Sequence, residues 1–166
     1  TNKLECTCSG KCRHKGDICN GWCVKCAPGK HPANGKGFKE ATTKLEIIKQ
    51  WWGINDNYNI GIVPGISGFN VIDVDPKNGG IESLSDFIKK EGDLGFDTAP
   101  CVRTGSGGFH YWFKADKNNP LSNSRGSLPP GIDVRGMNGY VVAAPSLHLS
   151  GEKYKWINIE NLEELR

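Results

Sequence analysis

The sequence predicts an α+β domain with a largely antiparallel sheet, preceded by a short Cys-rich segment. Short runs of alternating apolar and polar residues, bounded by Gly, Pro, Ser and Asn, recur between residues 58 and 157. Six of the seven cysteines lie between residues 6 and 26. With 166 residues, the chain is long enough for one ordinary domain with its own core. We therefore divide it into a Cys-rich element, 1–36, and a compact body, 37–166.

Two segments have the spacing of amphipathic helices. In TTKLEIIKQWW (42–52), Thr43 and Glu46 are spaced as a capping box, and an apolar stripe is expected to pack on the core. That stripe consists of Leu45, Ile48, Trp51 and Trp52. The second helix, GIESLSDFIKKEG (80–92), should end at Gly92. It should pack through Ile81, Leu84, Phe87 and Ile88.

Seven runs read as strands because they are short, β-branched or aromatic, and bounded by turn residues. They cover residues 58–65, 69–75, 100–105, 108–114, 132–136, 139–145 and 153–157. A long loop, 115–131, is rich in Asn, Ser and Pro and should be functional or mobile. The body is therefore a sheet with two helices.

Carboxylates end two of these strands. Side chains alternate along a strand, so Asp73 and Asp75 share one face while Ile72 and Val74 point into the core. Asp133 repeats the pattern in a later strand. Charges are rarely buried without a partner, and Mg²⁺ prefers carboxylate oxygens, so these residues are candidate metal ligands. A solvated strand end would give the same pattern.

A glycine-rich turn precedes another strand in VRTGSGGFHYWF. The backbone N–H groups of Ser106, Gly107 and Gly108 could cradle an anion, and His110 could hydrogen-bond a triphosphate oxygen. A structural histidine is the alternative. Arg135 should share the face of Asp133, where it could clamp a phosphate or simply pair with that carboxylate.

These motifs follow one another in an order that resembles the bifunctional DNA primase/polymerase (prim-pol) domain of the archaeo-eukaryotic primase superfamily, as found in phage and plasmid replication proteins. The resemblance runs through PGKHP, GFKEATT, NIGIVPG, VIDVDPKNGG, VRTGSGGFHYWF, GIDVRG and GYVVAAPSLHLSG. It implies the superfamily's catalytic fold, an RRM-like unit beside a second αβ lobe, with an N-terminal zinc-binding element.

The resemblance also implies roles for particular residues. Asp73 and Asp75 match the first catalytic motif, His110 the second and Asp133 the third. Two Mg²⁺ or Mn²⁺ ions on the three aspartates would then catalyse nucleotidyl transfer. The second motif is often Ser-x-His, and here Gly108 takes the serine position. Further candidate phosphate contacts are Arg103, Arg135 and Lys30.

The cysteines suggest metal. The segment CTCSGKCRHKGDICNGWCVKC has the short ligand spacings of thiolate zinc sites. Its candidate ligands are Cys6, Cys8, Cys12, Cys19, Cys23 and Cys26. With His14 and His31 they could hold one or two structural Zn²⁺ ions, and an iron–sulfur cluster or a disulfide knot is the alternative. Proteins that this chain resembles often carry a Cys-rich element before GKHP, which favours zinc.

The charge distribution suits a polyanionic partner such as nucleic acid, and a solvated lysine-rich face would give the same pattern. The chain carries 21 Lys and Arg against 18 Asp and Glu, and the basic excess lies in the first 50 residues. No run is long and apolar enough for a membrane span, so we expect a monomeric cytoplasmic protein, in a host cell if phage- or plasmid-encoded.

The expected function is template-directed DNA synthesis. The template would be single-stranded or primed DNA. The substrates would be dNTPs, and NTPs are a further possibility. The partner would be a helicase domain or a separate helicase protein. A non-catalytic zinc-dependent DNA-binding module and a metal-dependent nuclease or phosphoesterase are the alternative functions.

Overall fold

The computed structural model describes residues 29–33, 36–124 and 128–159. These residues form two α-helices, α1 (Leu45–Ile54) and α2 (Gly80–Glu91), and seven strands. The strands are β1 (Gly61–Ile62), β2 (Phe69–Val74), β3 (Cys101–Arg103), β4 (Phe109–Lys114), β5 (Ile132–Arg135), β6 (Val141–Val142) and β7 (Lys155–Trp156). Each predicted run contains one of them, which confirms the mixed αβ prediction. The six candidate cysteine ligands of zinc and His14 lie outside the described residues, whereas His31 lies within them.

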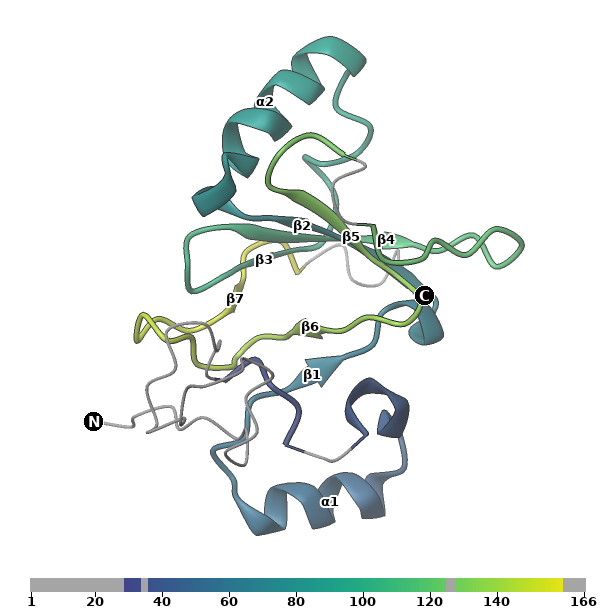
Figure 1. Ribbon diagram of the computed structural model, residues 1–166, viewed down its shortest axis with the longest axis vertical. Helices are drawn as coiled ribbons and strands as arrows, with labels where there is room; N and C mark the ends of the chain where they lie inside the picture. Colours follow the sequence, from purple (N-terminus) through teal and green to yellow (C-terminus); the bar gives the residue numbers. More distant parts are fainter. Residues whose placement is uncertain (1–28, 34–35, 125–127, 160–166) are drawn as a thin grey trace, which may run out of the picture.

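The strands form two sheets, in which all pairs of named strands are antiparallel. Five strands lie in the order β5-β2-β4-β3-β7, and β1 pairs with β6 in a separate two-stranded sheet (Figure 1). Although β1 and β2 are neighbours in the sequence, they belong to different sheets. The strand that carries Asp73 is therefore flanked on both sides, by β5 and by β4.

Both faces of the five-stranded sheet are covered. On one face Val74 packs with Leu84 of α2 and Ile132 of β5. On the other face Val71 packs with Trp112 and with Val141 of β6. The molecule is thus layered as α2, the five-stranded sheet, β1 with β6, and α1 (Figure 1). Asp73 shares the face of Val71, so it points between two layers rather than into open solvent.

Helix α2 forms where it was predicted, although Ile81 of the predicted packing face is exposed. Leu84 is buried in the core and Ile88 packs against it, while Gly92 follows the last turn with a φ of 86°. This left-handed conformation is available to glycine without a steric penalty, and the Gly92 N–H donates to the Ile88 carbonyl at 2.9 Å. The helix fixes the β2–β5 half of the sheet from one side.

Helix α1 differs from its prediction. The N-cap residue is Lys44, and its side chain makes no capping hydrogen bond. The Thr42 hydroxyl accepts a hydrogen bond from the Lys44 N–H at 3.1 Å. The prediction of a capping box between Thr43 and Glu46 is therefore wrong. The helix contains no buried residue, and Leu45 is 55% exposed. The apolar stripe that was expected to pack on the core is only partly buried. The reason is that α1 lies beyond β1, a two-residue strand that offers little apolar surface (Figure 1).

The RRM-like description stays a prediction. An RRM-like unit has the order β-α-β-β-α-β, and β2, α2, β3 and β4 follow its first four elements. Between β4 and β5, however, the described residues 115–124 and 128–131 contain no helix. Among the residues that the structure describes, no helix is long and apolar enough to cross a membrane.

Candidate active site

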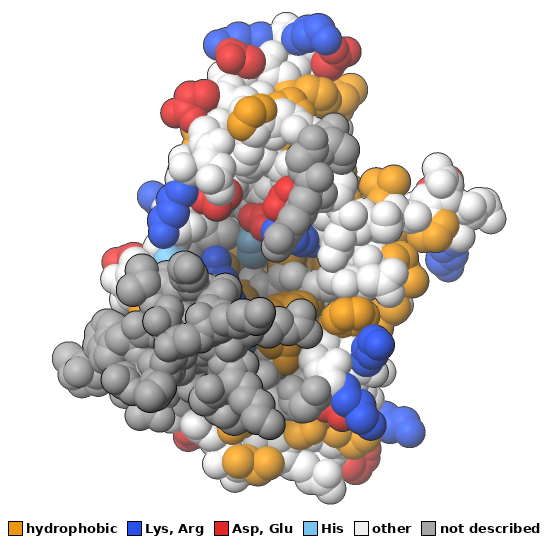
Figure 2. Space-filling view, in the orientation of Figure 1, with side chains coloured by type: hydrophobic (Ala, Val, Ile, Leu, Met, Phe, Trp, Pro, Cys, Tyr) orange, Lys and Arg blue, Asp and Glu red, His pale blue; other side chains and the backbone are white. Residues whose placement is uncertain are grey.

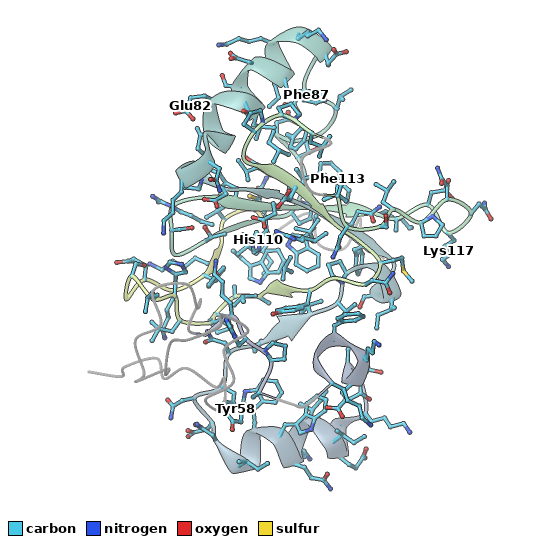
Figure 3. The ribbon with its side chains drawn as sticks, in the orientation of Figure 1. Tyr58, Glu82, Phe87, His110, Phe113 and Lys117 are labelled. Atoms are coloured by element: carbon cyan, nitrogen blue, oxygen red, sulfur yellow. The ribbon has the colours of Figure 1, made fainter. Side chains whose placement is uncertain are left out.

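Three of the predicted catalytic residues lie in one row across the sheet. Asp73 of β2 is the direct partner of Asp133 on β5 and of His110 on β4. Residues directly opposite one another in antiparallel strands point to the same face. Figure 3 shows His110 on the side of β4 that faces β6, with Phe113 on the other side. The register of three strands therefore brings these side chains together.

Arg135 bridges the two carboxylates. Its Nη2 lies 2.9 Å from Oδ2 of Asp133 and 3.2 Å from Oδ2 of Asp73, and its Nε lies 3.3 Å from the latter oxygen. The three side chains are only 19% to 28% exposed. The sequence left two roles for Arg135, a clamp for a phosphate or an ion pair with a carboxylate. The structure shows the ion pair. The guanidinium charge offsets the repulsion between the two carboxylates.

His110 is buried beside the same pair. The residue is 6% exposed, and its Nε2 lies 3.5 Å from Oδ1 of Asp73. Burial lowers the pKa of the imidazole below its usual 6.5, and the negative charge of Asp73 only partly opposes this. In the described part of the molecule, the buried Nδ1 has no hydrogen-bond partner. A neutral ring with one unused nitrogen can still donate to or accept from a ligand.

Asp75 is held differently from the other two aspartates. It lies just beyond β2, and its carboxylate accepts from Lys77 N at 3.0 Å and from Asn78 Nδ2 at 2.9 Å. These bonds cap the short 3-10 helix Pro76–Asn78. Within the described ranges, no three His, Cys, Asp or Glu side chains are grouped so that they could hold a metal ion. The structure thus brings together two of the three predicted ligands, with Arg135 between them.

The glycine-rich turn uses much of its own hydrogen-bonding capacity. Gly107 N donates to the Thr104 carbonyl, and Gly108 N donates to Thr104 Oγ1, both at 3.0 Å. Ser106 Oγ also lies 3.0 Å from Thr104 Oγ1. The amides of Gly107 and Gly108, predicted to cradle an anion, are therefore engaged within the turn, and Thr104 is the residue that organises it.

The packing explains why glycine occupies position 108. A Cβ built there would overlap the Val74 carbonyl oxygen and lie 2.8 Å from Pro76 Cδ. A serine, which the resemblance would place at this position, cannot be accommodated without moving β2 or Pro76. The close approach sets His110, two residues later, directly against Asp73.

Lys30 reaches the site from a distant part of the sequence. Its carbonyl accepts the Tyr140 hydroxyl at 2.6 Å, and the neighbouring Gly29 carbonyl accepts Asn59 Nδ2 at 2.9 Å. The Lys30 charge contributes to lowering the pKa of His110, although burial is the larger cause. Arg103, in contrast, pairs with Phe109, so it lies on the α2 face, opposite to His110.

Comparison with known families identifies the family of this chain. The family model described as "Prim-Pol: Bifunctional DNA primase/polymerase, N-terminal" matches residues 18–165. The chain belongs to the Prim-Pol family. Family membership indicates DNA primase and polymerase activity in general, which is nucleotidyl transfer. No curated protein matches the chain.

Tyr154, which the sequence did not single out as a site residue, packs beside His110, and His148 packs beside Tyr154. Tyr154 is 2% exposed, and its ring centroid lies 5.9 Å from that of His110 and 6.0 Å from that of His148. Burial, with a contribution from the charge of Asp73, raises the pKa of Tyr154 to about 12. His148 in turn packs against Gly105, where a Cβ would overlap it. The only sequence signal for Tyr154 was its inward position in KYKWI.

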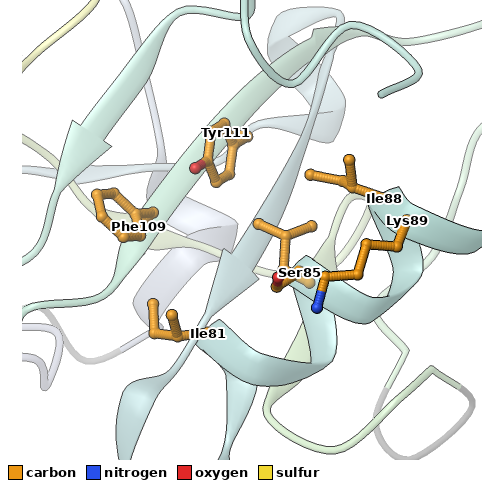
Figure 4. A pocket seen from close by; sticks show the side chains of 7 residues that line it. Ile81, Ser85, Ile88, Lys89, Phe109 and Tyr111 are labelled. Carbon is orange, nitrogen blue, oxygen red and sulfur yellow. The ribbon is translucent and has the colours of Figure 1, made fainter. Parts of the chain in front are cut away.

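The charged side chains of this candidate site lie on one face of the molecule. Figure 2 shows acidic, basic and histidine side chains meeting at the middle of this face, between α2 and the layer that contains β6. A shallow apolar pocket of about 350 Å³ lies elsewhere, between α2 and β4 (Figure 4). Its lining includes Phe109 and Tyr111, which point away from the Asp73 face, so it does not contain the carboxylate row.

Proposed function

We propose that this Prim-Pol chain is a template-directed DNA primase/polymerase that adds nucleotides to a 3′-hydroxyl with two divalent metal ions. The observation that carries the proposal is the direct pairing of Asp73 with Asp133 and with His110 across three strands. Two carboxylates and a neutral imidazole on one face suit phosphoryl transfer, which needs charge stabilisation and positioning rather than a protein nucleophile.

The donor set fits a hard divalent cation. Asp73 and Asp133 offer carboxylate oxygens on adjacent strands, and Mg²⁺ bound by one or two carboxylates keeps waters or substrate phosphates in its other positions. Asp75 would join them if its carboxylate left Lys77 N and Asn78. When bound, Mg²⁺ or Mn²⁺ would lower the pKa of the attacking hydroxyl and stabilise the pyrophosphate leaving group.

The other residues of the site would hold the nucleotide. His110 has an unpartnered Nδ1 within the described residues, suited to a triphosphate or sugar oxygen. Lys30 adds positive charge beside it, and Ser106 Oγ supplies a hydroxyl on the adjacent turn. Arg103 is not part of this proposal because it lies on the opposite face of the sheet.

The proposal includes partners and a structural metal. Single-stranded or primed DNA is the template, dNTPs are the substrates, and a helicase acts with the domain during replication. The six N-terminal cysteines bind one or two Zn²⁺ ions that order the 1–36 element, whose lysines contact DNA phosphates.

A primer-extension assay tests the catalytic proposal. Asp73→Asn and Asp133→Asn each keep the side-chain shape but remove a charged ligand. Loss of a residue that only supports a metal ligand typically lowers activity roughly 10- to 100-fold. Loss of a ligand itself should lower nucleotide incorporation by more than this. Asp86→Asn is the matched control, because Asp86 lies on the outer surface of α2 and is paired only with Lys89 among described residues.

The assay also separates the alternative functions. It is run with primed and unprimed templates, with Mg²⁺ and Mn²⁺, and with dNTPs and NTPs. Near-wild-type incorporation by Asp73→Asn or Asp133→Asn would refute the metal assignment. DNA shortening without incorporation would indicate a nuclease, and DNA binding with neither reaction would indicate a binding module.

A further inference from the structure

The bridge made by Arg135 places a positive charge between the two proposed metal ligands. One Nη2 atom contacts Oδ2 of both Asp73 and Asp133, at 3.2 and 2.9 Å. A divalent cation shared by the same two oxygens would need that space. The guanidinium and the cation are therefore competitors for one position, and both cannot occupy it.

We propose that Arg135 holds the position of the metal before metal binds, and that the divalent cation displaces it so that its guanidinium becomes available to a nucleotide phosphate. This inference rests on the proposed metal site at Asp73 and Asp133. It assigns Arg135 two successive partners, the carboxylates first and the phosphate afterwards.

The charge balance favours this exchange. Two carboxylates and one guanidinium leave a formal charge of −2 + 1 = −1 in the bridged state. A divalent cation neutralises both carboxylates and frees one positive charge. The free guanidinium then lies in a partly enclosed site without its former partners, where an anion stabilises it. Metal binding should therefore raise the affinity for phosphate, and the coupling is reciprocal.

The surroundings of Arg135 provide a place for the released side chain. Its charge reaches Tyr140 and contributes to lowering the pKa of that phenol, although burial raises this pKa overall. Tyr140 in turn donates its hydroxyl to the Lys30 carbonyl. Tyr140 precedes Val141, which packs against Val71, the direct strand partner of Arg135. The segment that carries Lys30 is therefore joined to a part of the fold next to Arg135. Arg135 and Lys30 would then offer two positive charges to one triphosphate.

The test is a Mn²⁺ titration, followed by electron paramagnetic resonance, of the 166-residue chain. The protein keeps its proposed zinc, and no other divalent metal and no nucleotide is present. Arg135→Gln removes the competing cation, so it should bind Mn²⁺ at least about tenfold more tightly than the wild type, a change of about 1.4 kcal/mol. Arg135→Lys keeps the charge but loses the fork that spans both carboxylates, and should give an intermediate affinity. Asp133→Asn identifies which Mn²⁺ ions bind at the row.

A charge-matched control separates the local effect from net charge. Lys90→Gln also removes one positive charge, from an exposed ion pair with Glu91, and should leave Mn²⁺ affinity unchanged. Equal or weaker Mn²⁺ binding by Arg135→Gln and Arg135→Lys would refute the displacement while leaving the metal site intact. No Asp133-dependent Mn²⁺ binding in any variant would refute both the displacement and the proposed metal site.

Discussion

Arg135 contacts Asp73 through two guanidinium nitrogens, Nε at 3.3 Å and Nη2 at 3.2 Å, although 62 positions separate the residues in the sequence. The same Nη2 reaches Asp133, so a single side chain offsets two adjacent carboxylates. This contact explains how like charges can lie side by side at the edge of a core. Substitutions that change the charge of these side chains, and changes of pH, should therefore alter ligand binding and stability in directions that can be predicted.

Gly108→Ala should destabilise the protein. The added Cβ would overlap the Val74 carbonyl and crowd Pro76, both held by backbone structure that cannot move freely. We expect the free energy of unfolding to fall by about 1–3 kcal/mol, as in other overpacked sites. Urea denaturation monitored by tryptophan fluorescence measures the change.

Gly53→Ala is the control for the glycine experiment. Gly53 lies in helix α1, and a Cβ there would meet nothing within 4 Å. Alanine has the higher helix propensity, so this variant should be neutral or more stable by up to about 1 kcal/mol. Equal stability of Gly108→Ala and wild type would mean that the tight contact with β2 is not present in solution.

His110 should make the folded protein less stable in mild acid. Burial lowers its pKa in the folded state, whereas in the unfolded chain it binds a proton near pH 6.5. Below pH 6.5 the unfolded chain therefore binds more protons, and the free energy of unfolding falls as pH falls until the folded state is also protonated. Above pH 6.5 this contribution is constant. One such group changes the unfolding free energy by at most about 1.4 kcal/mol per pH unit.

The measurement is urea unfolding between pH 5 and pH 8. Burial also lowers the pKa of His148, so the comparison is made in a His148→Gln background. Adding His110→Gln should flatten the remaining dependence of stability on pH below 6.5. Identical pH profiles with and without His110 would contradict its assignment as a buried neutral imidazole.

Zinc should be present in stoichiometric amount. A Cys-rich element of about 30 residues with few large apolar side chains needs a staple to become ordered, and closed thiolate sites supply one. Elemental analysis of protein purified without chelator should find one or two zinc ions per chain. The double variant Cys23→Ser, Cys26→Ser should contain less zinc and bind DNA more weakly. The slope of the logarithm of the DNA-binding constant against the logarithm of salt concentration should become shallower by about one unit for each lost phosphate contact.

Cys101→Ser is the control for the cysteine experiment. Cys101 is a buried free thiol of β3, and burial raises its pKa to about 12, so it is not a thiolate at neutral pH. Its substitution should leave zinc content unchanged. Metal-free protein with paired thiols would refute the zinc site.

The sequence by itself determined the elements and the inward or outward direction of most side chains. Alternation placed Asp73 opposite in direction to Ile72 and Val74. Residue type and the bounding turn residues marked the seven strands. The stop of α2 at Gly92 followed from the free left-handed conformation of glycine. The order of motifs also gave the family, which the match to residues 18–165 confirms.

Only the tertiary structure decided which of these side chains meet. Strand order depends on contacts between residues far apart in the chain. The alternation within one strand gives the face that a side chain takes, but it does not give the strand that pairs with it. The pairing of β2 with β5 and β4 therefore set Asp133 and His110 beside Asp73, turned Arg103 to the other face, and put Arg135 between two carboxylates. The residue types decided which chemistry the site can carry out. Long-range packing decided which charged side chains contact one another, because only folding brings residues so far apart in the sequence within a few ångströms.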